Sequence, residues 1–417
     1  MILLIVLGIG FVVMVVVALC ESLIRYRFFC RFIPQIKARD GRLIVLSNRL
    51  SVVRIAQRDG FDARLVRGSR NSATILNESL ELYEVSKGLL SQSEAECIVG
   101  QVDEFCSRFF REISADYFFA WNGSSLVARV MAAYVRGLNV RTLFFEIGNF
   151  PSKLFVDPEG VNIRSWFAKN YKTLERSHLD MDAFALWRDH YLGEKRKSHT
   201  VQQAQTSMSL NWCYPLDCLG FYGLSAPSSE RPDVLRRTWN FVRSKILNYD
   251  FDVFTPHSET PYVFFPMQVS TDTQLLWNSP VDNFTAVKKA VQIAEQNGCR
   301  LVVKPHPAEI NRVEVIKLAS LRDDLGFAFV DGNTFEILEH CQSVVTINST
   351  VGMEAMLCDK PVCTLGMAMY SEFSLEDIAL YLQCYLLDID RFSDEPFDAD
   401  QIEIIFGRAE INRLSLD

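Results

Sequence analysis

Two segments of the chain end in side chains that suit phosphate binding. In each, a short apolar run leads into polar residues, which are Lys304 and His306 after residues 301–303, and Asn348, Ser349 and Thr350 after residues 344–347. Apolar, β-branched runs of this length are typical of buried parallel strands, and ligands of open α/β sheets gather at the carboxyl ends of such strands. We therefore expect a crevice that holds the phosphate of a nucleotide-sugar.

The second segment has the features of an anion site at the start of a helix. Asn348, Ser349 and Thr350 stand where a strand gives way to a helical pattern, so hydroxyls and free backbone N–H groups would face the same way as the positive end of the helix dipole. The structural alternative is that Ser349 or Thr350 only caps the helix. Likewise, His306 between two prolines could donate to a phosphate oxygen, or be a structural histidine.

Two further strand ends carry candidate residues. Gln268 and Asp272 follow the apolar run 262–266 and could hydrogen-bond a base or ribose, or cap a loop. In the first half of the chain, Asn122 follows the run 117–121, and Glu146 follows three apolar or aromatic residues. A partly desolvated Glu146 would have a raised pKa suited to proton abstraction, although an ordinary turn glutamate fits the same pattern.

The elements that position these residues alternate between strand and helix. Strands are predicted at 43–46, 117–121, 141–145, 262–266, 301–303, 327–330, 344–347 and 361–365, with helices between them, including 94–113, 126–138 and 283–297. This alternation predicts an α/β protein with parallel sheets. We expect an N-terminal domain over residues 43–250 and a C-terminal domain over residues 261–400.

The N-terminus predicts a membrane anchor. Residues 2–20 carry no charge and are about as long as the ~20 residues that a helix needs to cross a bilayer. A cleaved signal peptide would show a basic start and a small-residue cleavage site, so we expect an uncleaved transmembrane helix over residues 1–24. Six Lys and Arg residues between positions 25 and 42 then place the rest of the chain in the cytoplasm, at the bacterial inner membrane.

Composition narrows the function classes. The 417 residues are 49% hydrophobic and have a net charge of −8, so the chain can bury large cores and has no overall basic field for nucleic acid. Eleven cysteines are scattered without a metal-binding spacing, as expected for reduced thiols, and no metal site is inferred. The basic run 195–197 is read as a solvated face, with contact to an anionic lipid or acceptor as the alternative.

Several of these motifs together resemble a known family. The segments are Phe265-Pro266-Met267-Gln268 with Asp272, Lys304-Pro305-His306-Pro307, 348–356 with Glu354, and Lys360-Pro361-Val362, joined in the first half by Trp121-Asn122-Gly123 and Phe145-Glu146-Ile147-Gly148. They resemble the capsular polysaccharide synthesis glycosyltransferases, in particular the β-Kdo transferases of the capsule lipid-linker pathway. The resemblance covers roughly residues 115–370.

The resemblance implies a GT-B-like pair of Rossmann-type domains that face a cleft. It implies that CMP-Kdo is the donor, bound in the C-terminal half, that a membrane glycolipid is the acceptor in the N-terminal half, on the side of Asn122, and that no cofactor is needed. Glu146 would be the base of an inverting transfer. The donor-side residues would be His306, Lys304, Gln268, Asp272, Asn348, Ser349, Thr350 and Glu354. Other capsule synthesis and export proteins would be further partners.

Two other functions fit parts of the pattern. A transferase that uses CDP-glycerol or another activated donor could also use a His-Pro turn and a Ser-Thr helix start. The other function is that of a membrane-anchored capsule assembly subunit, which would have the same fold but no catalytic activity. Activity after substitution of Glu146 distinguishes the enzyme from the silent subunit.

Overall fold

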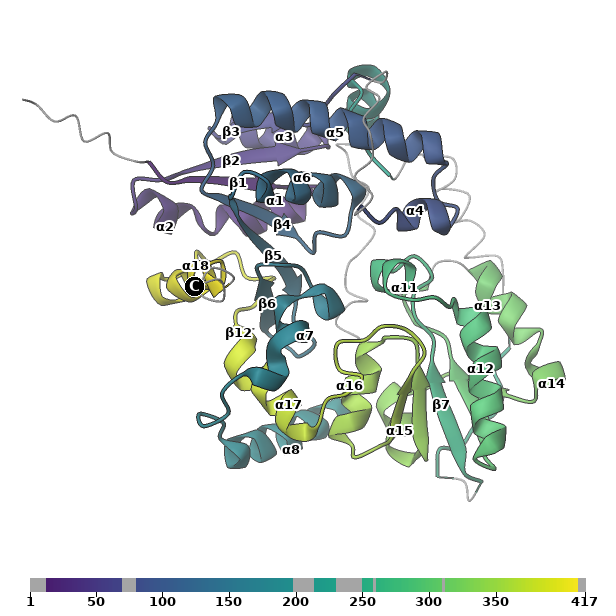
Figure 1. Ribbon diagram of the computed structural model, residues 1–417. Coiled ribbons are helices and arrows are strands. Elements are labelled where there is room, and N and C mark those ends of the chain that lie inside the picture. The colour runs from purple at the N-terminus through teal and green to yellow at the C-terminus, as the bar shows by residue number, and fades with distance from the viewer. Residues whose placement is uncertain are drawn as a thin grey trace, which may run out of the picture.

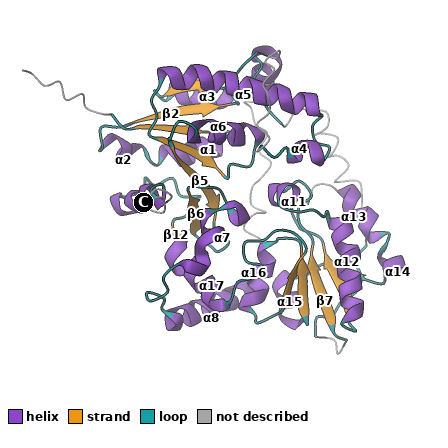
Figure 2. Cartoon of the chain, viewed as in Figure 1, coloured by secondary structure: helices purple, strands orange, loops and turns teal. Residues whose placement is uncertain are grey.

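The chain folds around two β-sheets, each accompanied by helices (Figure 1, Figure 2). The computed structural model describes residues 13–69, 80–197, 214–229, 250–257, 260–309 and 312–411. The first sheet has the strand order β12-β6-β5-β4-β1-β2-β3, and the second has the order β11-β10-β7-β8-β9. The predicted α/β class with mostly parallel strands is confirmed.

The first sheet contains seven strands, and β1 to β5 are joined to one another by parallel pairings, whereas β6 pairs antiparallel with β5. Its strands are β1 (Val15–Leu19), β2 (Arg42–Ser47), β3 (Asp62–Leu65), β4 (Tyr117–Trp121), β5 (Arg141–Ile147), β6 (Lys153–Asp157) and β12 (Leu387–Asp388). The helices of this half are α1 (Leu23–Cys30), α2 (Ile33–Lys37), α3 (Leu50–Arg58), α4 (Tyr83–Ser86), α5 (Gln92–Glu112), α6 (Leu126–Arg136), α7 (Trp166–Asn170), α8 (Met181–Lys197) and α9 (Tyr214–Cys218). Short 3₁₀ turns, η1 (Asn162–Arg164) and η2 (Tyr171–Thr173), flank α7, and a π-turn, η4 (Leu219–Gly223), follows α9.

The predicted N-terminal transmembrane helix is wrong where the structure describes it. Val15–Leu19 forms β1, in the middle of the first sheet, with Val17 paired to Ile44 of β2 on one side and to Phe118 of β4 on the other. A parallel strand covered on both faces is as continuously apolar as a membrane helix, so composition alone does not separate the two. The Val-rich sequence was the signal for a strand. Residues 2–12 lie outside the described residues, and no described helix has the length and apolarity to span a bilayer.

The second sheet is entirely parallel and carries the predicted phosphate segments. Its strands are β7 (Tyr262–Pro266), β8 (Arg300–Lys304), β9 (Ala328–Phe329), β10 (Ser343–Thr346) and β11 (Val362–Thr364). The accompanying helices are α11 (Thr273–Trp277), α12 (Asn283–Gln296), α13 (Arg312–Ala319), α14 (Arg322–Leu325), α15 (Thr334–His340) and α16 (Thr350–Leu357). The apolar face of α12, with Val287 and Ala290, packs on this sheet as its sequence pattern predicts.

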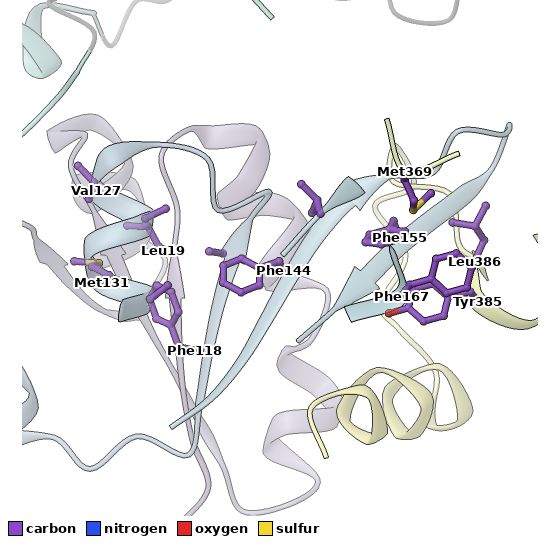
Figure 3. Close-up of a cluster of buried hydrophobic side chains, with 14 of the residues drawn as sticks. Leu19, Phe118, Val127, Met131, Phe144, Phe155, Phe167, Met369, Tyr385 and Leu386 are labelled. Carbon is purple, nitrogen blue, oxygen red and sulfur yellow. The ribbon is translucent and has the colours of Figure 1, made fainter. Parts of the chain in front are cut away.

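The C-terminal segment returns to the first sheet. It contains α17 (Leu375–Leu380), a π-turn η5 (Tyr381–Tyr385), β12 and α18 (Ala399–Arg408), and β12 pairs antiparallel with β6. Tyr385 and Leu386 thereby pack with Phe155 and Phe167 in one buried cluster that extends to Leu19 and Phe144 (Figure 3). The expected C-terminal domain, residues 261–400, therefore includes a stretch that belongs structurally to the first half.

Candidate active site

Lys304 and His306 follow β8, the strand predicted to present them. Lys304 is buried, and this burial lowers the pKa of its ammonium group. The Nδ1 atom of His306 accepts a hydrogen bond of 3.1 Å from the backbone N–H of Ala308. Burial, and then the charge of Lys304, lowers the pKa of His306, which favours the neutral ring. Because Nδ1 accepts from Ala308, the proton of the neutral ring is assigned to Nε2. The turn thus offers one N–H donor and one cation, as phosphate binding requires.

Asn348 and Ser349 lie between β10 and α16, and Thr350 is the first residue of α16, as predicted. Ser349 is the N-cap of α16, and its hydroxyl accepts from the backbone N–H of Val351 at 3.3 Å. The capping interpretation of Ser349 therefore holds, and capping leaves the positive end of the helix dipole in place. However, β7 lies between β8 and β10, so the two segments are separated by two strand spacings, or ~10 Å. This separation suits two parts of one nucleotide better than a single phosphate oxygen.

Gln268 is held by Asn348. Its Nε2 donates to Oδ1 of Asn348 at 2.8 Å, and its Oε1 accepts from the backbone N–H of Asn348 at 3.0 Å. The Nδ2 of Asn348 in turn donates to the carbonyl of Gln274 at 2.9 Å. The structure brings together these two residues, which were both predicted to bind the nucleotide-sugar. Their side-chain amides, however, fix the loop between β10 and α16.

Asp272 and Glu354 are engaged with the protein itself. Asp272 is the N-cap of α11 and accepts from the backbone N–H of Gln274 at 2.8 Å. Glu354 is buried in α16, where Oε1 accepts from the hydroxyl of Tyr191 at 2.8 Å and from Nζ of Lys195 at 2.6 Å. The basic run 195–197 is thus partly paired across the two halves. Glu354 stabilises the contact of α16 with α8.

Glu146 and Asn122 come together at the carboxyl ends of β5 and β4. Burial raises the pKa of the Glu146 carboxyl, whereas the backbone N–H of Ile147, the side chain of Asn122 and the charges of Arg25 and Arg391 act in the opposite direction. The carboxylate accepts from the backbone N–H of Ile147 at 2.9 Å. Asn122 has a φ of 44° and donates its backbone N–H to the carbonyl of Phe145 at 2.8 Å, which ties the two strand ends. Glu146 therefore has the environment of a general base.

A residue that the sequence reasoning missed joins this strand end to α16. The Nδ2 of Asn149 donates to Oγ1 of Thr350 at 3.2 Å, and its Oδ1 accepts from the hydroxyl of Tyr381 at 2.7 Å. Asn149 is a polar residue just after a predicted strand, so the rule that selected Glu146 could have included it. Tyr381 is more than two hundred residues away and carries no sequence signal.

The halves also meet around Trp277 of α11. Its ring stacks on Tyr83 with centroids 5.7 Å apart, and its Nε1 donates to Glu81 at 3.0 Å. Two cavities lie apart from these residues. One has a volume of about 450 Å³ and is lined in part by Arg54 and Phe109, and the other has a volume of about 640 Å³ and is lined in part by Pro261 and Val362. The convergence of polar groups on strand ends, rather than a cavity, identifies the site.

The sequence matches the family described as "Capsule polysaccharide biosynthesis protein" over residues 126–377. A 132-residue stretch is 38% identical to Protein FixF of Sinorhizobium fredii (strain NBRC 101917 / NGR234) and covers 30% of this chain and 31% of that protein. The chain thus spans about a third of the length of this relative. The β-Kdo 2,4 transferase of Thermosulfurimonas dismutans KpsC is similar over 71% of this chain and 87% of that one, with 17% identity and a TM-score of 0.43. The β-Kdo 2,7 transferase of the same KpsC covers 95% and 99%, with 13% identity and a TM-score of 0.40.

The family match extends over more than half of the chain and contains both strand ends that present Glu146 and His306. The chain is therefore a member of the capsule polysaccharide biosynthesis protein family.

Proposed function

We propose that the chain transfers Kdo from CMP-Kdo to a hydroxyl group of a membrane glycolipid, with inversion at the anomeric carbon. Membership of the family supports a role in the synthesis of capsule polysaccharide. The resemblance of the motifs to those of β-Kdo transferases supports CMP-Kdo as the donor. The observation that carries the proposal is the bond between Asn149 and Thr350, because it puts the strand end of Glu146 beside the start of α16. A general base next to the helix start that faces the donor is the minimum arrangement for such a transfer.

The chemistry assigns Glu146 to the acceptor. Its carboxylate takes the proton of the acceptor hydroxyl while the hydroxyl oxygen attacks the anomeric carbon of Kdo. The bond from that carbon to the CMP phosphate breaks, and the phosphate leaves with the electron pair. Because the nucleophile enters opposite to the leaving group, the configuration inverts. The raised pKa of Glu146 makes it a stronger base than an exposed carboxylate.

The donor side stabilises the negative charge that develops on the phosphate. His306 donates from Nε2 to this phosphate and Lys304 adds a positive charge, whereas the positive end of α16, two strand spacings away, faces another part of the nucleotide. Preorganised donors of this kind contribute about 3 kcal/mol each to barrier lowering. This arrangement needs no metal ion or cofactor, so activity should persist in EDTA.

The proposal places the chain at the cytoplasmic face of the bacterial inner membrane, where its glycolipid acceptor and other capsule synthesis and export proteins would meet it. Nucleic acid is not expected as a partner.

The test is transfer from CMP-Kdo to a panel of glycolipid acceptors, with the wild type and with Glu146→Gln. General base catalysis contributes about 10²- to 10⁴-fold, so the variant should lose that much of kcat while it keeps its affinity for CMP. Unchanged activity of Glu146→Gln would remove it as the base. Transfer from CDP-glycerol instead of CMP-Kdo would favour the polyol transferase, and no transfer by the wild type would favour the non-catalytic subunit.

A further inference from the structure

Arg391 lies in the segment that returns to the first sheet after β12, and it forms no direct ion pair with any described residue. It is half-buried, and its guanidinium lies over the ring of Trp121 at 4.6 Å and over Phe392 at 5.1 Å. The described part of the chain gives it no hydrogen bond and no ion pair. Trp121, the ring beneath Arg391, pairs with Phe145 in the register of β4 and β5, so Arg391 lies at the strand end that carries Glu146. Burial lowers the pKa of Arg391, and the charge of Glu146 acts in the opposite direction.

Neighbouring arginines show that this arrangement is an exception. Arg31 packs on the same C-terminal segment, and it donates to the carbonyls of Glu395 at 2.6 Å and Asp390 at 2.8 Å. Arg408 donates to the carbonyl of Tyr385 at 2.9 Å. A guanidinium has five N–H donors, and removing it from water without acceptors is costly. Each of the other two arginines thus donates to backbone carbonyls, whereas Arg391 makes no hydrogen bond with the described residues.

A second arginine acts on the same carboxylate. Arg25 of α1 follows β1, the strand beside β4, and its Nη1 is paired with Glu21 at 2.5 Å. Its charge, like that of Arg391, acts on Glu146. Two arginines thus act on the carboxylate of Glu146. Arg25 is paired with Glu21, whereas Arg391 has no direct ion pair among the described residues.

We propose that Arg391, stacked on Trp121 and supported by the charge of Arg25, binds a carboxylate or phosphate group of the substrate beside Glu146. The inference rests on the proposed function only in taking Glu146 as the end of the site that meets the acceptor. The planar fork of an arginine matches both anions with two parallel hydrogen bonds, which would orient the substrate over the aromatic platform. Two sources offer this chemistry: an acidic group of the acceptor, and the carboxylate of a sugar-acid donor.

Anion binding here would also tune the base. A bound anion neutralises the charge of Arg391, which in its absence lowers the pKa of Glu146. Glu146 would become more basic only when the acidic substrate is in place. The subsite would therefore couple substrate recognition to proton abstraction.

The test uses the full chain and the methyl glycoside of Kdo, with its carboxyl methyl ester as the uncharged probe. Calorimetric titration compares the wild type, Arg391→Gln, and Arg408→Gln as a matched arginine from the same C-terminal segment. Hydrogen bonds to a charged group predict that the wild type binds the acid roughly 10- to 100-fold more tightly than the ester. Arg391→Gln should bind both probes equally, and Arg408→Gln should keep the wild-type preference while its melting temperature falls.

Kinetics then identify the source of the anion. A higher KM for the acceptor alone in Arg391→Gln would identify the acceptor's acidic group, and a higher KM for CMP-Kdo alone would identify the donor carboxylate. Equal binding of acid and ester by the wild type, or an unchanged preference in Arg391→Gln, would overturn the subsite. If the wild type transfers nothing but still prefers the acid through Arg391, the proposed function fails and the subsite stands.

Discussion

Gln268 and Asn348 hold each other through two hydrogen bonds, of 2.8 and 3.0 Å, between the ends of β7 and β10. One bond uses the side chain of Asn348 and the other uses its backbone N–H, so the loop that leads into α16 is fixed from both sides. The start of the predicted phosphate site therefore depends on Gln268, whose side-chain amide holds the loop in place.

Gln268→Ala should lower both stability and donor affinity. The substitution leaves partly buried polar groups of Asn348 unsatisfied, which costs about 1–3 kcal/mol of unfolding free energy. Urea unfolding of the variant should show this loss, and the KM for the donor should rise because the start of α16 is less well fixed. Gln296→Ala, an exposed glutamine at the end of α12, is the control and should change neither quantity. Full stability of Gln268→Ala would show that the pair does not fix the loop.

Asn149 and Tyr381 should act as one unit in catalysis. Asn149→Ala removes the bond to Thr350, and Tyr381→Phe removes the hydroxyl that orients the Asn149 amide. Each single variant should lower kcat/KM by about tenfold, the equivalent of ~1.4 kcal/mol, because Glu146 and the start of α16 are no longer held at a fixed relative position. The double variant should be little worse than either single variant. Additive losses in this cycle would mean that the two side chains act separately.

β1 should be essential to folding. Val17 is fully buried in the middle of the first sheet, so Val17→Asp buries an unpaired carboxylate and should cost more than about 3 kcal/mol. Val13→Asp is the matched control, because Val13 is 44% exposed, and it should melt like the wild type. A chain that begins at Arg42 lacks β1 altogether and should show no cooperative melting of the N-terminal half. Normal melting of that shortened chain would contradict the strand assignment.

Glu146→Gln should stabilise the protein at neutral pH while it abolishes transfer. The pKa of Glu146 is raised in the folded state, so the ionised carboxylate costs stability above the pKa of an unfolded glutamate, and this cost is absent at lower pH. Thermal melts should therefore favour Glu146→Gln at pH 7 and converge with the wild type below about pH 4. A lower melting temperature of Glu146→Gln at pH 7 would contradict a raised pKa.

The same pKa sets the acid limb of activity. The base must be ionised, so kcat/KM should fall as the pH drops through a value above that of an ordinary glutamate. This limb should remain in His306→Gln, which removes the histidine of the site. An acid limb that disappears in His306→Gln would assign the titration to the histidine instead.

The strand ends could be predicted from the sequence because each depends on a local pattern. A short apolar run followed by polar residues located Glu146, His306 and Ser349 at the carboxyl ends of β5, β8 and β10. The same reasoning failed for residues 15–19, since a strand buried on both faces and a membrane helix share one composition. It also failed for Arg391, which reaches the site through a long-range return of the chain that no local pattern encodes.

The donor site provides the most direct test of the account. Thermal stability of the full chain should be measured with CMP, CDP, CDP-glycerol, UDP and ADP, for the wild type and for His306→Ala. A ligand at about a hundred times its dissociation constant stabilises by ~2.7 kcal/mol, which a melting curve resolves. The account predicts stabilisation by CMP that His306→Ala loses. Stabilisation by CDP-glycerol or UDP with no effect of CMP would contradict the CMP-Kdo assignment, and CMP binding that survives in His306→Ala would contradict the proposed position of the phosphate.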